Sequence, residues 1–281
     1  MEIKPNQSTI DTLTSSETQS GGGSDWIMHH ILDSHELEIA PFGSIPLPHI
    51  SLFGLDISIT KHVVFLWIVA ILLILAFKFA ANSYKKSRVP HGIANFLEVM
   101  IVFVRDEIAK PTIGKGYDKF LPYLLTVFFF ILFSNFVGLL PNGATVTSNI
   151  SVTVTLAVIS FLVIQGGGMM KNGALGYFKG LIPSGVPAWL LPIMFIVELL
   201  GLFTKPFALA IRLFANMTAG HIVIFALIGL IFILKTFFVA PVSVAFALFI
   251  YLLEILVAII QAYIFTMLTA LFIGMAVHQE H

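Results

Sequence analysis

Five charged or polar side chains lie in one of the most apolar stretches of the sequence, at Glu198, Lys205, Arg212, Asn216 and His221. A charge at the centre of a bilayer costs about 3 kcal/mol on insertion scales. An arginine cannot lower this cost by losing its proton, because its pKa stays above about 12. Arg212 therefore indicates a functional site that supplies a partner. The alternative is a buried arginine that pairs with a structural carboxylate and holds helices together.

The spacing of these residues predicts two polar faces on one helix. Glu198, Lys205 and Arg212 recur every seven residues and form a slowly drifting stripe, which Asn216 joins four residues after Arg212. His221 follows Arg212 by nine residues, which places it on the opposite face, roughly 13 Å further along the axis. The segment thus presents polar groups at two depths.

A later apolar segment carries Glu254 and Gln261, seven residues apart and therefore on one helix face. If the two segments form an antiparallel hairpin that turns near residues 237–238, His221 lies level with Glu254 and Arg212 lies close to Gln261. A His–Glu pair can exchange protons near neutral pH, whereas an Arg–Gln pair cannot titrate. The sequence thus predicts two separate polar pairs.

The amino-acid composition indicates a membrane protein and excludes several kinds of functional site. Of the 281 residues, 58% are hydrophobic and 11% are charged, against about a quarter charged in soluble domains. The absence of cysteine excludes disulfides, thiol catalysis and cysteine-based metal sites, and the net charge of zero does not suggest a nucleic-acid partner. The sequence has no phosphate-binding GxxxxGK[ST] motif. We expect no catalytic, cofactor or metal site.

The expected fold is an all-α polytopic membrane protein with about five spans and one amphipathic helix on the membrane surface at 92–109. The spans are expected at 61–81, 121–140, 147–166, 190–234 and 242–277. As one helix, residues 190–234 would be about 67 Å long, more than twice the hydrocarbon thickness. We therefore expect the last two spans to form a long, strongly tilted hairpin, or a kink near Pro206. The glycines at 166–168 are expected in the connection after the third span.

The sequence divides into three regions. Residues 1–25 are expected to be disordered. Residues 26–60 form an extracytoplasmic segment, with a short amphipathic helix at 26–39 and a hairpin within 49–60. Residues 61–281 form the membrane domain. The connections on one side of the five spans carry ten lysines and arginines, against three on the other side. This bias predicts an N-terminus outside and a C-terminus in the cytoplasm.

The third span begins with an unusually polar stretch, TSNISVTVT. Serine and threonine side chains in helices often bond back to their own backbone. The alternative is that this stretch lines a water-filled cavity. The sequence does not decide between these two interpretations.

The stretches KPFALAIRLFANMTAGH and E(x6)QAYIF, together with the order of spans, resemble subunit a of F-type ATP synthases from about residue 26 onward. The resemblance implies that Arg212 faces a carboxylate of the rotating c-ring. It associates His221, Glu254 and Gln261 with proton access and packing around the arginine. Asn216 belongs to the same motif, and Glu198 matches an acidic position on the cytoplasmic side.

The sequence departs from the family at two places. His221 and Glu254 stand where some bacterial members carry Glu and His, and a proton relay survives either order. Asn149 stands where many members carry aspartate at the outer mouth. A water-lined opening beside Thr147, Ser148, Ser151 and Thr153 is the expected substitute. The residues expected to line the half-channel are Asn149, Ser151 and Thr153.

The resemblance implies a non-catalytic stator subunit that conducts protons through two offset half-channels separated by Arg212, with H⁺ favoured over Na⁺. Implied partners are the c-ring of subunit c, the peripheral stalk subunit b, the F1 sector and the bilayer of a bacterial inner (plasma) membrane. A proton-coupled secondary transporter is the alternative, but such folds often show internal repeats, and the sequence shows none. A purely structural membrane scaffold is the third possibility.

Overall fold

The chain is described by a computed structural model, in which the polypeptide forms two compact units. One unit comprises Met1–Lys61 and Thr218–Leu253, and the other comprises His62–Met217 and Glu254–His281. The described residues are 36–39, 43–48, 51–52, 55–56, 58–86, 92–140, 143–180, 187, 189–234 and 238–278. The expected disorder of residues 1–25 and the expected helix over 26–35 lie outside these residues.

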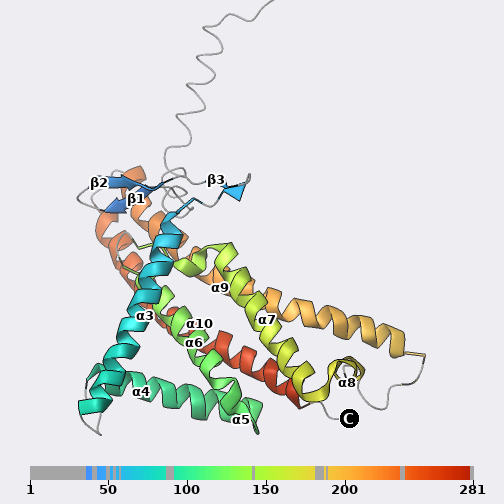
Figure 1. The fold of residues 1–281 in the computed structure, drawn as a ribbon. Coiled ribbons are helices and arrows are strands. Elements are labelled where there is room, and N and C mark those ends of the chain that lie inside the picture. The colour runs from blue at the N-terminus through green and yellow to red at the C-terminus, as the bar shows by residue number, and fades with distance from the viewer. Residues whose placement is uncertain are drawn as a thin grey trace, which may run out of the picture. The chain divides into compact units, whose positions relative to one another are not determined.

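Five of the described helices are long and apolar enough to cross a membrane, which confirms the expected polytopic all-α membrane fold (Figure 1). They are α3 (Lys61–Lys86), α6 (Leu121–Gly138), α7 (Ile150–Asn172), α9 (Leu191–Leu234) and α10 (Val239–Val277). At 1.5 Å per residue, the 44 residues of α9 span about 66 Å. The helix continues through Pro206. Proline is tolerated inside membrane helices where neighbouring groups satisfy the freed carbonyl.

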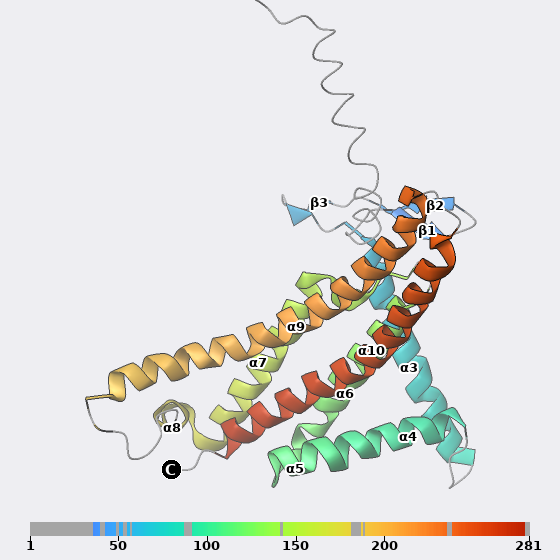
Figure 2. The same ribbon diagram turned by 180° about the vertical axis from the view of Figure 1, so that it is seen from behind.

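The predicted surface helix is present and longer than expected. Helix α4 (Ile93–Phe103) continues through a π-helical stretch, η1 (Val104–Ala109), into α5 (Lys110–Ile113). Figures 1 and 2 show α4 turning sharply away from the end of α3. Leu97, Val104 and Ile108 are buried, whereas Ile93 and Phe96 are exposed. Some apolar residues of α4 and η1 therefore pack on the protein, and the exposed ones are free to contact lipid.

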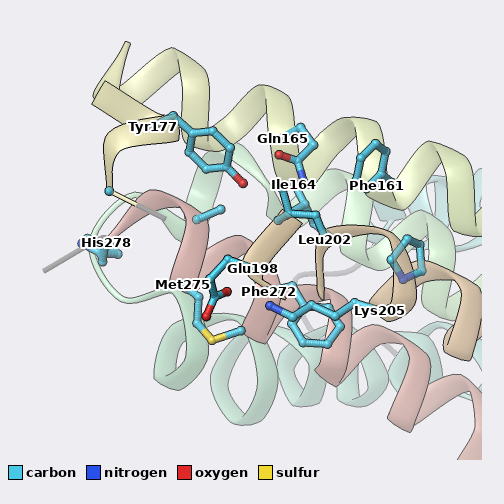
Figure 3. A pocket seen from close by; sticks show the side chains of 13 residues that line it. Phe161, Ile164, Gln165, Tyr177, Glu198, Leu202, Lys205, Phe272, Met275 and His278 are labelled. Carbon is cyan, nitrogen blue, oxygen red and sulfur yellow. The ribbon is translucent and has the colours of Figure 1, made fainter. Parts of the chain in front are cut away.

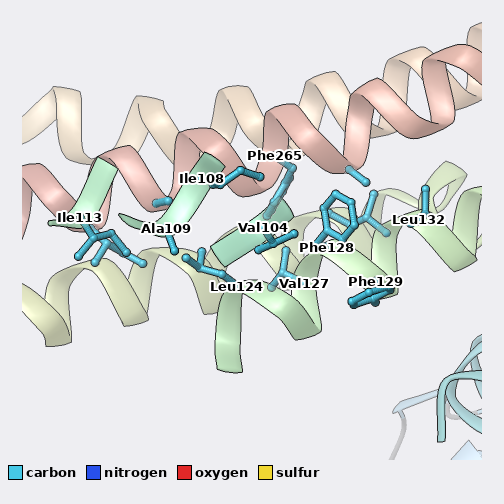
Figure 4. Close-up of a cluster of buried hydrophobic side chains, with 14 of the residues drawn as sticks. Val104, Ile108, Ala109, Ile113, Leu124, Val127, Phe128, Phe129, Leu132 and Phe265 are labelled. Carbon is cyan, nitrogen blue, oxygen red and sulfur yellow. The ribbon is translucent and has the colours of Figure 1, made fainter. Parts of the chain in front are cut away.

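The hydrophobic core of the second unit is centred on α6, which follows a short 3-10 turn, η2 (Tyr117–Lys119). Phe128 and Phe129 are each 1% exposed, and their rings meet edge to face with centroids 5.4 Å apart. Figure 4 shows Phe128 between α6, the η1–α5 segment and α10, where Phe265 joins the cluster, and Phe129 on the other side of α6. This packing holds α10 against α6 and so positions the polar residues that α10 carries.

The third span begins and ends later than the predicted 147–166. Residues Val146–Ser148 form a 3-10 turn, η3, and α7 runs from Ile150 to Asn172. The glycines at 166–168 lie inside this helix and not in a connection. A Cβ at Gly168 would come within 2.5 Å of the Tyr177 ring in α8 (Ala174–Lys179), and one at Gly167 within 2.9 Å of the Phe120 ring. Here glycine allows two aromatic rings to approach the helix backbone.

The first unit contains two small antiparallel hairpins and the joined ends of α9 and α10. Strands β1 (Glu36–Ile39) and β2 (Gly43–Pro46) form one hairpin, and β3 (Ser51–Leu52) and β4 (Leu55–Asp56) form the other. The second hairpin confirms the one expected within 49–60. The amphipathic helix expected at 26–39 is wrong for its last four residues, because these pair as a strand. Helix α10 begins three residues earlier than expected, since a proline in the first turn loses no internal hydrogen bond.

Candidate functional site

Arg212 lies on the exposed side of α9 in the second unit. On the same helix, Leu209 and Leu213 are buried at 4% and 0% exposure and belong to the hydrophobic core. The residues that flank Arg212 on α9 are therefore apolar and packed inward, whereas the side chain of Arg212 is exposed. Among the residues that the structure describes, no carboxylate lies within salt-bridge distance of Arg212. Within the described ranges, the structural alternative therefore has no acid of the same chain that neutralises the arginine.

One turn after Arg212, Asn216 connects α9 to α10. Its Nδ2 donates a hydrogen bond to Oε1 of Gln261, at 3.0 Å. Gln261 is 3% exposed, so its amide is buried and bonded at the same time. The antiparallel register expected from the sequence is confirmed here, but the partner of Gln261 is Asn216 and not Arg212. The short side chain of Asn216 reaches the amide of Gln261, whereas the longer side chain of Arg212 on the same face stays exposed.

Glu254 is buried at 4% exposure, on the helix face that Gln261 shares seven residues later. His221 belongs to the first unit, where its ring lies 6.5 Å from the ring of Phe225. Since Glu254 belongs to the second unit, the expected pairing of His221 with Glu254 stays a prediction. The placement of Glu254 and Gln261 on one buried face is confirmed.

A second polar contact reaches the buried side of α10 from α6, and the sequence does not predict it. Asn135 of α6 is fully buried, and its Nδ2 donates to the backbone carbonyl of Ala258 at 3.4 Å. Its Oδ1 accepts a 2.6 Å hydrogen bond from Thr147, which is also fully buried. Ala258 follows Glu254 by one helical turn. The sequence signal for this layer is the pair Ser134 and Asn135 inside the largely apolar second span.

Of the three residues expected to line the outer half-channel, two are engaged by their own helix. Asn149 is the N-cap of α7, and its Oδ1 accepts a 2.9 Å hydrogen bond from the backbone N–H of Ser151. Thr153 is buried and donates to the carbonyl of Ile150 at 3.0 Å. Ser151 is exposed. The bonding of Thr153 favours the interpretation in which the threonines of this stretch satisfy their own backbone.

Glu198 lies in a pocket of about 260 Å³ at the far end of the same unit (Figure 3). Four further polar residues line this pocket: Gln165 of α7, Tyr177 of α8, Lys205 of α9 and His278, which follows α10. The ammonium group of Lys205 lies 5.2 Å from the centroid of the Phe272 ring, where it is attracted to the aromatic face. Burial raises the pKa of Tyr177, so this hydroxyl stays protonated. Sequence spacing could not reveal Gln165 and Tyr177, because tertiary packing brings them to the pocket.

The mouth of this pocket carries a second contact between helices. The side-chain nitrogen of Lys171, at the end of α7, lies 3.2 Å from Nδ1 of His278, just after α10. Asn172 donates to the carbonyl of Ala276 at 3.0 Å. These contacts hold the ends of α7 and α10 together beside the pocket. Within the described part of the chain, no three acidic, histidine or cysteine side chains are grouped closely enough to hold a metal ion.

Comparison with known proteins finds one family. The family model described as ATP synthase A chain matches residues 63–274. The ATP synthase subunit a of Chloroherpeton thalassium is 55% identical over 258 residues, which are 90% of this chain and 77% of that protein. The ATP synthase subunit a 2 of Chlorobaculum tepidum is 55% identical over 90% of this chain and 72% of its own. The ATP synthase subunit a of Myxococcus xanthus is 54% identical, with shares of 81% and 75%.

Proposed function

Because the chain belongs to the ATP synthase A chain family, we propose that it is the proton-conducting stator subunit of the membrane sector. In this role it does no nucleotide chemistry of its own. It supplies two offset half-channels to the carboxylates of a rotating ring of c subunits, and Arg212 separates them. Subunit b of the peripheral stalk and the F1 sector are its further partners in the complex.

The observation that carries this proposal is the exposed Arg212 without a carboxylate partner in the described part of its own chain. A permanent charge at this depth is stabilised by an anion. A rotor carboxylate is neutral while it faces lipid, because burial in an apolar medium raises its pKa. Opposite Arg212 the anion is favoured, and the carboxylate gives up its proton there.

The magnitudes suit a motor. At about 4 Å and an effective dielectric constant near 20, the attraction between the guanidinium and a carboxylate is about 4 kcal/mol. A proton that crosses 100 mV gains about 2.3 kcal/mol. The attraction is therefore strong enough to deprotonate the rotor site and weak enough for a few protons to release it. The same positive charge repels a free proton between the half-channels.

We assign the two half-channels to opposite sides of Arg212. Protons reach the rotor past His221 and the buried Glu254, and they leave on the other side of Arg212 through the pocket that contains Glu198. In the orientation that the lysine and arginine bias predicts, the first route opens outside and the second opens to the cytoplasm. H⁺ is the proposed ion.

The experiment is a disulfide cross-link between α9 and the rotor, which the lack of native cysteine makes free of background. Ala215 is on the exposed side of α9, three residues after Arg212, and Ala210 is 2% exposed on the packed side. In the assembled complex, Ala215→Cys should cross-link to a cysteine placed beside the c-subunit carboxylate, and Ala210→Cys should not. Equal cross-linking of both variants, or none at Ala215→Cys, would contradict the proposed interface.

A further inference from the structure

His62 is a buried imidazole that the proposed proton route does not use. It lies in the first turn of α3 and is 5% exposed. Its Nε2 is 3.4 Å from the hydroxyl oxygen of Ser148 in η3. Histidine is the side chain whose ordinary pKa lies near neutrality. A buried histidine beside a proton route can therefore carry protons and need not serve packing alone.

Polar groups continue from His62 towards α10. Ser148 donates its hydroxyl hydrogen to the carbonyl of Thr145 at 2.8 Å. The next residue towards the core, Thr147, bonds Asn135, which in turn bonds the carbonyl of Ala258. Thr145, Thr147 and Asn135 are 2%, 0% and 0% exposed. This buried layer ends one helical turn from Glu254, the acidic residue of the proposed outer half-channel.

Ser134 adds an independent observation at this layer. It precedes Asn135 on α6 and is fully buried, and its hydroxyl has no hydrogen-bond partner within the described ranges. A buried hydroxyl without a partner costs free energy that a water molecule recovers. Ser134 therefore offers a hydroxyl group to a water molecule beside this layer.

Charged residues lie at both ends of the layer that begins at His62. Lys61 precedes it in the chain, and Glu254 lies on α10, beyond the layer. Helix α6, η3 and the residues of α7 before Lys171 contain no acidic residue, lysine, arginine or histidine. His62 stands at one end of this layer, and Glu254 lies one helical turn beyond the other end.

We infer that His62 is a further proton-carrying residue of the outer half-channel. Its imidazole accepts a proton from outside water at one ring nitrogen and becomes an imidazolium. It then releases that proton to water held by the Ser148–Asn135 layer, on the way to Glu254, and returns to the neutral form. This inference rests on the proposed function, because it requires proton flow through the chain.

The test measures proton flux through the assembled complex in vesicles, as a function of the pH on the outer side and with the other side held fixed. His62→Gln keeps a side-chain N–H that can reach Ser148 but cannot titrate. We expect it to slow flux about tenfold, less than the loss of a residue acting on the reacting atoms, because water replaces part of the relay. Its flux should then vary with outer pH only as the driving force does, without the additional dependence that the unmodified complex and the control variant show. Thr155→Ala, which removes an exposed hydroxyl bonded to its own helix, is the matched control and should leave flux unchanged.

Ser148→Ala provides the second variant, because it removes the contact of His62 and leaves the histidine in place. It should slow flux and keep the dependence on outer pH. A His62→Gln complex with normal flux and a normal outer-pH profile would overturn the inference, as would a response to cytoplasmic pH instead. If His62→Gln does not assemble, normal flux in Ser148→Ala overturns it. These outcomes leave the role of Arg212 untouched, since that role fails only if coupling survives the loss of the guanidinium.

Discussion

Asn216 of α9 donates a 3.0 Å hydrogen bond to the buried amide of Gln261 on α10. The bond lies one turn after Arg212 and joins the helix that carries the arginine to the helix that carries Glu254. Together with the buried Leu209, Leu213 and Met217, the bond holds this part of α9 against its neighbours. The first prediction concerns this bond.

Asn216→Ala leaves the buried amide of Gln261 without its donor, which costs about 1–3 kcal/mol. We expect a lower thermal midpoint of the assembled complex and weaker ATP-driven proton pumping. The Asn216→Ala/Gln261→Ala pair should lose less than the two single variants together, by about 0.6 kcal/mol, as for other hydrogen bonds between membrane helices. Strict additivity in this cycle would show that the bond contributes nothing.

Glu254→Gln should slow proton translocation without loosening the subunit. Glutamine has nearly the same shape as the buried glutamate, so packing on α10 is kept while the titrating group is removed. The measurement is passive proton conductance through the membrane sector after removal of F1, with the amount of bound subunit c as the assembly control. Conductance equal to that of the unmodified complex would remove Glu254 from the route.

Gly168→Ala should destabilise the subunit, whereas Gly166→Ala should not. A methyl group at Gly168 would come within 2.5 Å of the Tyr177 ring, and overpacking of this kind costs about 1–3 kcal/mol. A methyl group at Gly166 meets open space, and alanine favours helix there by up to about 1 kcal/mol. The thermal midpoints of the two complexes give the comparison, and equal midpoints would contradict the packing of α7 against α8.

Asp106 gives a prediction about pH. Hydrogen bonds from Arg105 and then from Lys110 hold the pKa of this carboxyl below its ordinary value. A lowered pKa contributes stability that is present above the unfolded-state pKa and is lost as the pH falls through the folded-state pKa. Any loss of stability in Asp106→Asn should therefore stay constant between pH 5 and 8. It should be small because the pair is exposed. A loss that fades between pH 7 and 5 would show that the carboxyl has a higher pKa.

The membrane segments follow from the sequence because burial in lipid requires long apolar helices, whatever their partners are. The register of α9 and α10 also follows, since a short connection leaves one antiparallel alignment. The glycines at 166–168 are expected in a connection because glycine has a low helix propensity. In the structure they lie inside α7, where two aromatic rings occupy the space of the absent side chains. Propensity and packing act in opposite directions at this point, and packing decides.

The candidate site divides in the same way. Arg212, Glu198 and Glu254 are visible in the sequence, because a charge in an apolar segment is costly and needs a reason. Asn149 has the composition of a channel residue, yet it caps α7. Asn135, Gln165 and Tyr177 carry little signal alone, because their roles depend on the residues that α7, α8 and α10 bring beside them. The faces of a single helix can therefore be predicted from residue spacing, whereas the contacts between side chains of different helices cannot.

The most direct measurement is ATP-driven proton pumping by vesicles that contain the complete complex with Arg212→Ala. Ile211→Ala, which shortens the exposed apolar neighbour and leaves the charge in place, is the matched control. Without the guanidinium, nothing at this depth favours the rotor anion or separates the two half-channels. We predict that Arg212→Ala assembles and pumps no protons, while Ile211→Ala pumps normally. Coupled pumping by Arg212→Ala would contradict the account.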